Sequence, residues 1–170
     1  VSAFLTGCIE IANVVQPPNA LIGNTFDVAV ETVFGPEDPN GTDGELGRPV
    51  FAINLPSGWE IVSCTAVYNA ATYDCVTPDP AHDTSVNTVR PGNWQSRRMP
   101  LNQVFVDGET IDVTWTIRPT TAGDFTLDYW ASVEIASLIG DYHSDISPED
   151  TIPFDHPITI FTAIPTLNDY

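Results

Sequence analysis

Apolar and polar residues alternate with a period of two along much of this chain. In the segment 25–34 the apolar positions are Phe26, Val28, Val30 and Phe34, and carboxylates fall between them. Because successive side chains of a strand point to opposite faces, this pattern predicts a strand with one buried and one solvated face. The same alternation, or a short apolar run, predicts further strands at 9–15, 50–55, 60–64, 103–106, 111–118, 125–135 and 158–161.

Residues that favour turns separate these segments. They are Pro17-Pro18-Asn19, Pro56-Ser57-Gly58, Asp107-Gly108-Glu109 and Thr121-Ala122-Gly123-Asp124. About seven to nine short strands, punctuated in this way and each with one solvated face, are typical of an all-β fold. We therefore expect an immunoglobulin-like antiparallel β-sandwich.

The chemistry of three turns resembles that of a known group of repeats. Leu55-Pro56-Ser57-Gly58-Trp59, Val106-Asp107-Gly108-Glu109-Thr110 and Pro119-Thr120-Thr121-Ala122-Gly123 each stand between strands. Over about residues 10–137 this order resembles the immunoglobulin-like repeats of bacterial surface proteins grouped as DUF11. The resemblance implies a structural or adhesive module without catalytic residues. The chain departs from the repeats in a long loop, 76–101, and in a pair of cysteines.

The last seven residues carry a second resemblance. Ile164-Pro165-Thr166-Leu167-Asn168-Asp169-Tyr170 is similar to the start of the IPTL-CTERM sorting regions, which begin Ile-Pro-Thr-Leu-Ser-Glu-Trp. The resemblance implies a bacterial protein of the cell surface or exterior, and we expect Val1 to lie near the start of a mature chain whose signal peptide has been cleaved. We accordingly divide the chain into an N-terminal extension and candidate donor strand (1–8), a sandwich (9–161) and the start of a sorting tail (162–170).

Charge narrows the range of partners. The chain has 23 acidic residues against five arginines and no lysine, a formal net charge of -18. Such a surface repels phosphate, which argues against nucleic acids and anionic membranes as partners. We find no stretch long enough to span a membrane. Without lysine, the chain also lacks the nucleophile of the Lys-Asn isopeptide bonds that stiffen many Gram-positive pilins.

Covalent cross-linking is therefore left to cysteine. Cys64 and Cys75 flank a segment with an Asn-Ala-Ala turn, and a hairpin at this spacing brings them within reach of a disulfide. Cys8 is then unpaired, either as a buried thiol or as a link to another chain. The segment Leu5-Thr6-Gly7-Cys8 also resembles a lipobox, which would instead imply lipid attachment at Cys8.

An acidic, glycine-rich loop is the candidate metal site. Calcium prefers six to eight oxygen ligands, and Asp38, Asn40, Asp43 and Glu45 supply several within the segment 35–45. The spacing is not that of an EF-hand, so a solvated acidic loop is the alternative. Asn40-Gly41-Thr42 is also a glycosylation sequon.

The tryptophans offer one further type of site. Trp115 falls on the apolar positions of its strand and is expected in the core. Trp130 falls on the polar positions and is expected to face outward, while Trp94 is expected in a loop beside Arg97 and Arg98. Exposed aromatic rings stack on sugars, so Trp94 and Trp130 are candidate glycan-binding residues.

Catalytic motifs are not found in the sequence. The three histidines are separate and form no metal-binding spacing, and there is no nucleophile elbow or phosphate loop. We expect a non-enzymatic structural subunit of an extracellular fibre, layer or matrix that assembles by β-strand addition. The alternative is a monomeric adhesin or carbohydrate-binding module that uses the tryptophans and calcium.

Overall fold

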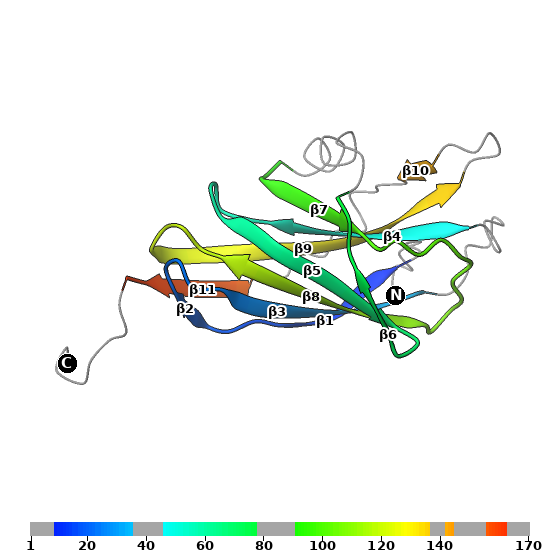
Figure 1. Ribbon diagram of the computed structural model, residues 1–170, viewed down its shortest axis with the longest axis horizontal. Helices are drawn as coiled ribbons and strands as arrows, with labels where there is room; N and C mark the ends of the chain where they lie inside the picture. Colours follow the sequence, from blue (N-terminus) through cyan, green and yellow to red (C-terminus); the bar gives the residue numbers. More distant parts are fainter. Residues whose placement is uncertain (1–8, 36–45, 78–90, 137–141, 145–155, 163–170) are drawn as a thin grey trace, which may run out of the picture.

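The computed structural model shows an all-β molecule and describes residues 9–35, 46–77, 91–136, 142–144 and 156–162. Eleven strands lie in these ranges and form two sheets (Figure 1). The predicted immunoglobulin-like β-sandwich is confirmed. The strands exceed the expected seven to nine because several short edge strands carry no sequence pattern of their own.

The first sheet has five antiparallel strands. Their order is β1 (Glu10–Val15), β3 (Phe26–Val33), β8 (Thr110–Arg118), β5 (Glu60–Tyr68) and β6 (Ala71–Asp74). β8 pairs along almost its whole length with β3 on one side and β5 on the other. At roughly 3.3 Å per residue its nine residues extend for about 26 Å, and this length gives the separation of the two ends of the sheet along the strand direction.

The second sheet has six strands and mixed pairing. Its main order is β2 (Asn19–Leu21), β11 (His156–Phe161), β9 (Gly123–Ala136), β4 (Gly47–Asn54) and β7 (Trp94–Arg98). β10 (Tyr142–Ser144) also pairs with β9. β2 and β11 run parallel, which differs from the purely antiparallel sandwich expected from sequence.

The core between the sheets follows the predicted alternation. Phe26, Val28, Val30 and Phe34 are buried, and Trp115 is buried as expected. Buried residues of both sheets pack in the same cluster, among them Phe51, Ile53, Leu55, Ile111, Val113, Ile117, Leu127, Tyr129, Ile158 and Ile160. Burial of this apolar surface is the main stabilising contribution to the fold.

Thr32 is the polar member of the inward positions of β3. It is completely buried, and its hydroxyl donates a 3.0 Å hydrogen bond to the carbonyl oxygen of Ile111. The hydroxyl thus keeps a partner without water, and the alternation continues through a polar residue.

Both open sides of the sandwich are crossed by the chain as it changes sheets. Between β1 and β2, the Gln16 side-chain amide donates to the carbonyls of His156 and Pro157 and accepts from the Tyr129 hydroxyl. On the other side, Val76 follows β6 and exchanges two backbone hydrogen bonds with Arg98 of β7. These crossings connect the edges of the two sheets.

Three segments differ from the sequence prediction. The Pro-Pro-Asn turn runs directly into β2, and the expected loop 76–101 contains β7. The expected strand 103–106 is reduced to one bridge, Gln103 with Gly47, followed by Phe105 stacked on Phe34. In each case backbone pairing, which the local pattern does not encode, decides the outcome.

The described chain enters and leaves the sandwich at opposite ends (Figure 1). Glu10 at the start of β1 pairs with Val33, which lies opposite Thr110 at the start of β8. Phe161 at the end of β11 accepts a hydrogen bond from Ile22, and the adjacent Gly23 bonds to Pro119, just beyond the end of β8. The entry and exit points are therefore separated by about the length of β8.

Candidate functional site

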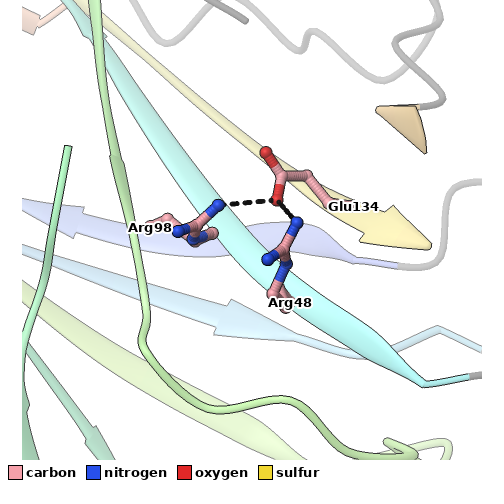
Figure 2. A network of polar contacts seen from close by, with 3 residues as sticks. All are labelled: Arg48, Arg98 and Glu134. Carbon is pink, nitrogen blue, oxygen red and sulfur yellow. Dashed lines mark hydrogen bonds and ion pairs between the residues drawn. The ribbon is translucent and has the colours of Figure 1, made fainter. Parts of the chain in front are cut away.

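The outer face of the β7–β4–β9 region carries a buried ionic network (Figure 2). Arg48 of β4 lies directly opposite Glu134 of β9 in the strand register, and Arg98 of β7 approaches from the next strand. Oxygen Oε2 of Glu134 lies 3.0 Å from Arg48 Nη2 and 3.3 Å from Arg98 Nη1. One carboxylate thus connects three neighbouring strands through two guanidinium groups.

Burial makes this network costly to disrupt. The Glu134 side chain is 7% exposed and each arginine side chain is 23% exposed. A carboxylate so far from water needs both a counter-charge and hydrogen bonds, and loss of its partners is strongly destabilising. Sequence alternation placed Glu134 on a solvated face, and the two arginines are too distant in sequence to reveal the pairing.

Beside this network, Trp94 and Trp130 pack together with Ala52. Their ring centroids are 6.0 Å apart in an edge-to-face arrangement, and each tryptophan is 2% exposed. Trp130 does point away from the main core, as expected, but Trp94 belongs to β7 and not to a loop. Neither ring presents a free face in this structure, and a sugar can stack on them only after they are uncovered.

This face of the second sheet differs from the usual outer face of a sandwich. It is buried at Val50, Ala52, Trp94, Ser96, Trp130, Ser132 and Glu134. The prediction of one solvated face for every strand is therefore wrong for this part of β4 and β9, which are buried on both faces.

The outer face of the first sheet is the opposite case. Asp27, Glu31 and Asp112 are exposed there, and we call this surface of β3 and β8 the acidic face. Glu31 lies directly opposite Asp112 in the register, although directly opposed like charges are unfavourable. Asp27 accepts a 2.7 Å hydrogen bond from Thr116 across the same two strands. Three exposed carboxylates thus lie on the outer face of this sheet.

The predicted hairpin between Cys64 and Cys75 is present. β5 and β6 are joined at Asn69 and Ala70, whose φ angles of 49° and 62° are those of a tight hairpin turn. The Cys75 amide donates to the Cys64 carbonyl, so the two residues face each other at the end of this ladder.

The two thiols lie close enough to form a hydrogen bond. That hydrogen bond and burial both raise the pKa of the Cys64 thiol. Cys64 is buried and Cys75 is half-buried, and both are free thiols in the structure. The disulfide stays a prediction, with the partners already in position.

Two buried tyrosines use their hydroxyl groups in hydrogen bonds between separate parts of the sandwich. The Tyr68 hydroxyl donates to Glu109 Oε1 at 2.7 Å and accepts from the Gln103 side chain at 2.6 Å. Burial and the neighbouring Glu109 raise the pKa of Tyr68. Burial, with a smaller contribution from the charge of Asp128, raises the pKa of Tyr129, whose hydroxyl bonds to Gln16.

Several predicted sites lie outside the described residues. These are the calcium ligands Asp38, Asn40, Asp43 and Glu45, the sequon at Asn40, Cys8, and the sorting motif Ile164, Pro165, Thr166 and Leu167. Within the described ranges, the acidic, histidine and cysteine side chains form no cluster of three or more suited to a metal. The same ranges contain no helix with the length and apolarity needed to cross a bilayer.

Comparison with known proteins gives matches in structure only. No family model matches the chain. No curated protein matches it. Among solved structures, the major pilin SpaD of Corynebacterium diphtheriae is similar with a TM-score of 0.50 and 10% identity, over 80% of this chain and 32% of that one. The chain thus spans about a third of the length of SpaD.

Two other similar structures have lower scores. A cohesin module from a Clostridium perfringens family 33 glycoside hydrolase has a TM-score of 0.47 and 11% identity, covering 91% of this chain and 98% of the module. The major pilin subunit BcpA of Bacillus cereus has a TM-score of 0.43 and 10% identity, covering 89% and 39%. The likeness to SpaD, at 10% identity, concerns the fold alone, which is a β-sandwich like that of this pilin.

Proposed function

We propose that this chain is a non-enzymatic structural subunit of an extracellular bacterial fibre, surface layer or matrix. Its subunits join by β-strand addition, in which an extended segment of one copy pairs with an open sheet edge of the next. The location follows from the sorting-type tail and the acidic composition, and the likeness of the fold to a pilin is compatible with it.

One observation carries the proposal: the chain enters the sandwich at one end and leaves it at the other. In chain order, residues 1–8 precede β1, which begins at one end, and residues 162–170 follow β11, which stops at the other end. Apolar segments attached at opposite ends suit a head-to-tail contact. A head-to-tail contact that does not close into a ring produces an open filament.

Charge explains why few contacts between copies are favourable. A net charge of -18 makes two copies repel each other over most of their surfaces. The uncharged runs 11–26 and 157–168 are among the exceptions, and they meet where β2 pairs with β11. Assembly through uncharged extended segments adds no further carboxylates to the contact.

The test is self-association of the whole chain and of two deletion variants. Negative-stain microscopy and analytical ultracentrifugation of the wild type, with and without calcium, are expected to show regular polymers. Deletion of residues 1–7 or of 162–170 is expected to abolish them, and thermal unfolding of each variant checks that the sandwich is intact. Unchanged polymers in both deletions would rule out assembly through these ends. A monomeric wild type that binds glycans only with calcium would favour the adhesin alternative.

A further inference from the structure

The sheet edges differ in how well they can accept an added strand, which bears on the proposed function. Natural edge strands are protected by shortness, proline, charge or a covering segment. β2 has three residues and follows two prolines. β7 carries Arg97 and Arg98, and its outer side already pairs with Val76 at Arg98. Both edges of the second sheet are therefore poor acceptors.

The two edges of the first sheet, β6 and β1, differ in how open they are to an added strand. β6 has four exposed or half-exposed residues and leads into the crossing at Val76. β1 has six residues, no proline and one charge, Glu10. Among the described residues its only strand partner is β3. A bulge at Ala12 interrupts its register, and the stretch from Asn13 to Val15 is regular.

The register shows which backbone groups of β1 point outward. The backbone amide of Phe34 donates to the carbonyl of Glu109, and the carbonyl of Phe34 accepts from the amide of Gly108, so both groups of Phe34 point toward the β8 side. Residues along an antiparallel strand direct their N–H and C=O groups alternately to either side, so Ala29, Glu31 and Val33 face β1. Val14 lies opposite Val30, which faces β8. The N–H and C=O groups of Val14 therefore point away from β3.

The same alternation is confirmed elsewhere in the sheet. When the alternation is continued across β8 and β5, the backbone N–H and C=O groups of Cys64 point toward β6. The Cys64 carbonyl indeed accepts a hydrogen bond from the Cys75 amide there. It also makes Ile11, which lies opposite Thr32, another outward residue of β1. On β6 it makes Thr72, opposite Val67, the outward counterpart of Val14.

Side chains and charge favour a strand of the same protein at β1. Ile11 and Val14 pack against the core yet remain half-buried, so apolar surface lies at the open rim beside the outward backbone groups. The run 11–26 has no charged residue, so the only charged side chain on β1 itself is that of Glu10. An added strand would satisfy the free backbone groups and complete the burial of both side chains.

We infer that the outer edge of β1 is the acceptor site for an extended, uncharged strand of a second copy. The inference rests on the proposed assembly by strand addition and specifies the acceptor. The added strand bonds to the outward groups of Ile11 and Val14, and its inward side chains cover the rim of the core.

A pair of proline variants tests this assignment. Val14→Pro removes an outward amide of β1 without removing a β1–β3 hydrogen bond, and proline is tolerated at such edge positions. Thr72→Pro makes the matched change on β6. We expect Val14→Pro to raise the concentration needed for assembly by about tenfold or more in ultracentrifugation. Thr72→Pro and the donor-retaining Val14→Ile are expected to assemble like the wild type.

The outcomes separate the two claims. Normal assembly of Val14→Pro, or selective loss in Thr72→Pro, would overturn the assignment to β1 while leaving strand addition in place. A wild type that stays monomeric would instead overturn the proposed function. If Val14→Pro fails to fold, amide exchange of the wild type decides. Exchange at Ile11 and Val14 must slow on assembly, and unchanged exchange at both would refute the inference.

Discussion

The Cys64–Cys75 pair gives the most direct stability prediction. A disulfide between them closes a ring of twelve residues around the β5–β6 hairpin. In the chain-entropy description, closing a ring of this size removes freedom from the unfolded state equivalent to roughly 3 kcal/mol at 25 °C. For a domain of this length, that stabilisation corresponds to an increase in Tm of about 6 to 12 °C.

The environment of the thiols also predicts how the bond forms. Disulfide chemistry needs a thiolate, and the raised pKa of buried Cys64 disfavours its ionised form. We expect Cys75, which is half-buried, to be the attacking group, or the bond to form before Cys64 is packed into the core. A folded, reduced sample should therefore oxidise slowly compared with an unfolded one.

The assay is thermal unfolding of oxidised and reduced protein in a Cys8→Ser background, which leaves a single pair of thiols. Peptide mass spectrometry of the oxidised sample should find Cys64 joined to Cys75. Cys75→Ser should unfold at the same temperature with and without reductant, and close to the reduced parent. Free thiols at both positions after aerobic purification, or equal Tm values for bonded and reduced protein, would refute the reasoning.

Three further predictions concern single side chains. Glu134→Gln should lower the free energy of unfolding by about 2 kcal/mol in denaturant titrations, because two largely buried guanidinium groups lose their counter-charge. The control is Glu60→Gln, which changes the exposed pair with Arg118 and should have no measurable effect on that free energy. Burial raises the pKa of Tyr129, so on raising the pH this hydroxyl ionises first in the unfolded chain, near pH 10. The stability that it contributes should be intact below that pH and fall above it. Tyr129→Phe should therefore weaken the fall in stability measured by unfolding curves between about pH 9 and 11. Ala70→Gly should stabilise the protein by up to about 1 kcal/mol, because Ala70 has a φ of 62° and glycine adopts it without strain, whereas an unchanged Tm would mean that the turn relaxes in solution.

The sequence predicted the central strands because their pattern reflects burial directly. In β3 and β8, alternate apolar residues mark the face that meets the other sheet, and Phe26, Val28 and Trp115 are buried accordingly. The edge strands β2 and β7 were missed for the opposite reason. β7 reads Trp-Gln-Ser-Arg-Arg and has no apolar alternation, and it becomes a strand by pairing with β4.

The ionic network was missed because it depends on register between distant segments. Glu134 occupies a polar position of an alternating strand, which is normally solvated, and no local signal distinguishes it from Asp128. Only the pairing of β4 with both β7 and β9 brings Arg48 and Arg98 to it. The contact between the tryptophans was missed for the same reason. Trp130 has the predicted orientation, but it contacts Trp94 only because β9 pairs with β4 and β4 pairs with β7.

Salt dependence distinguishes assembly at β1 from a contact between charged faces. Strand addition at β1 holds a second copy beside β3 and β8, so the acidic faces of two copies, each with Asp27, Glu31 and Asp112, come close together. Raising the ionic strength from 0.01 to 0.15 M shortens the screening length from about 30 to about 8 Å, so this repulsion weakens and assembly should strengthen. A contact that docked the arginines of β4 and β7 onto the acidic face would behave in the opposite way, because salt screens attraction as well. Polymers that dissolve as salt is added, measured by sedimentation, would therefore argue against the uncharged edge and for a charge-paired interface.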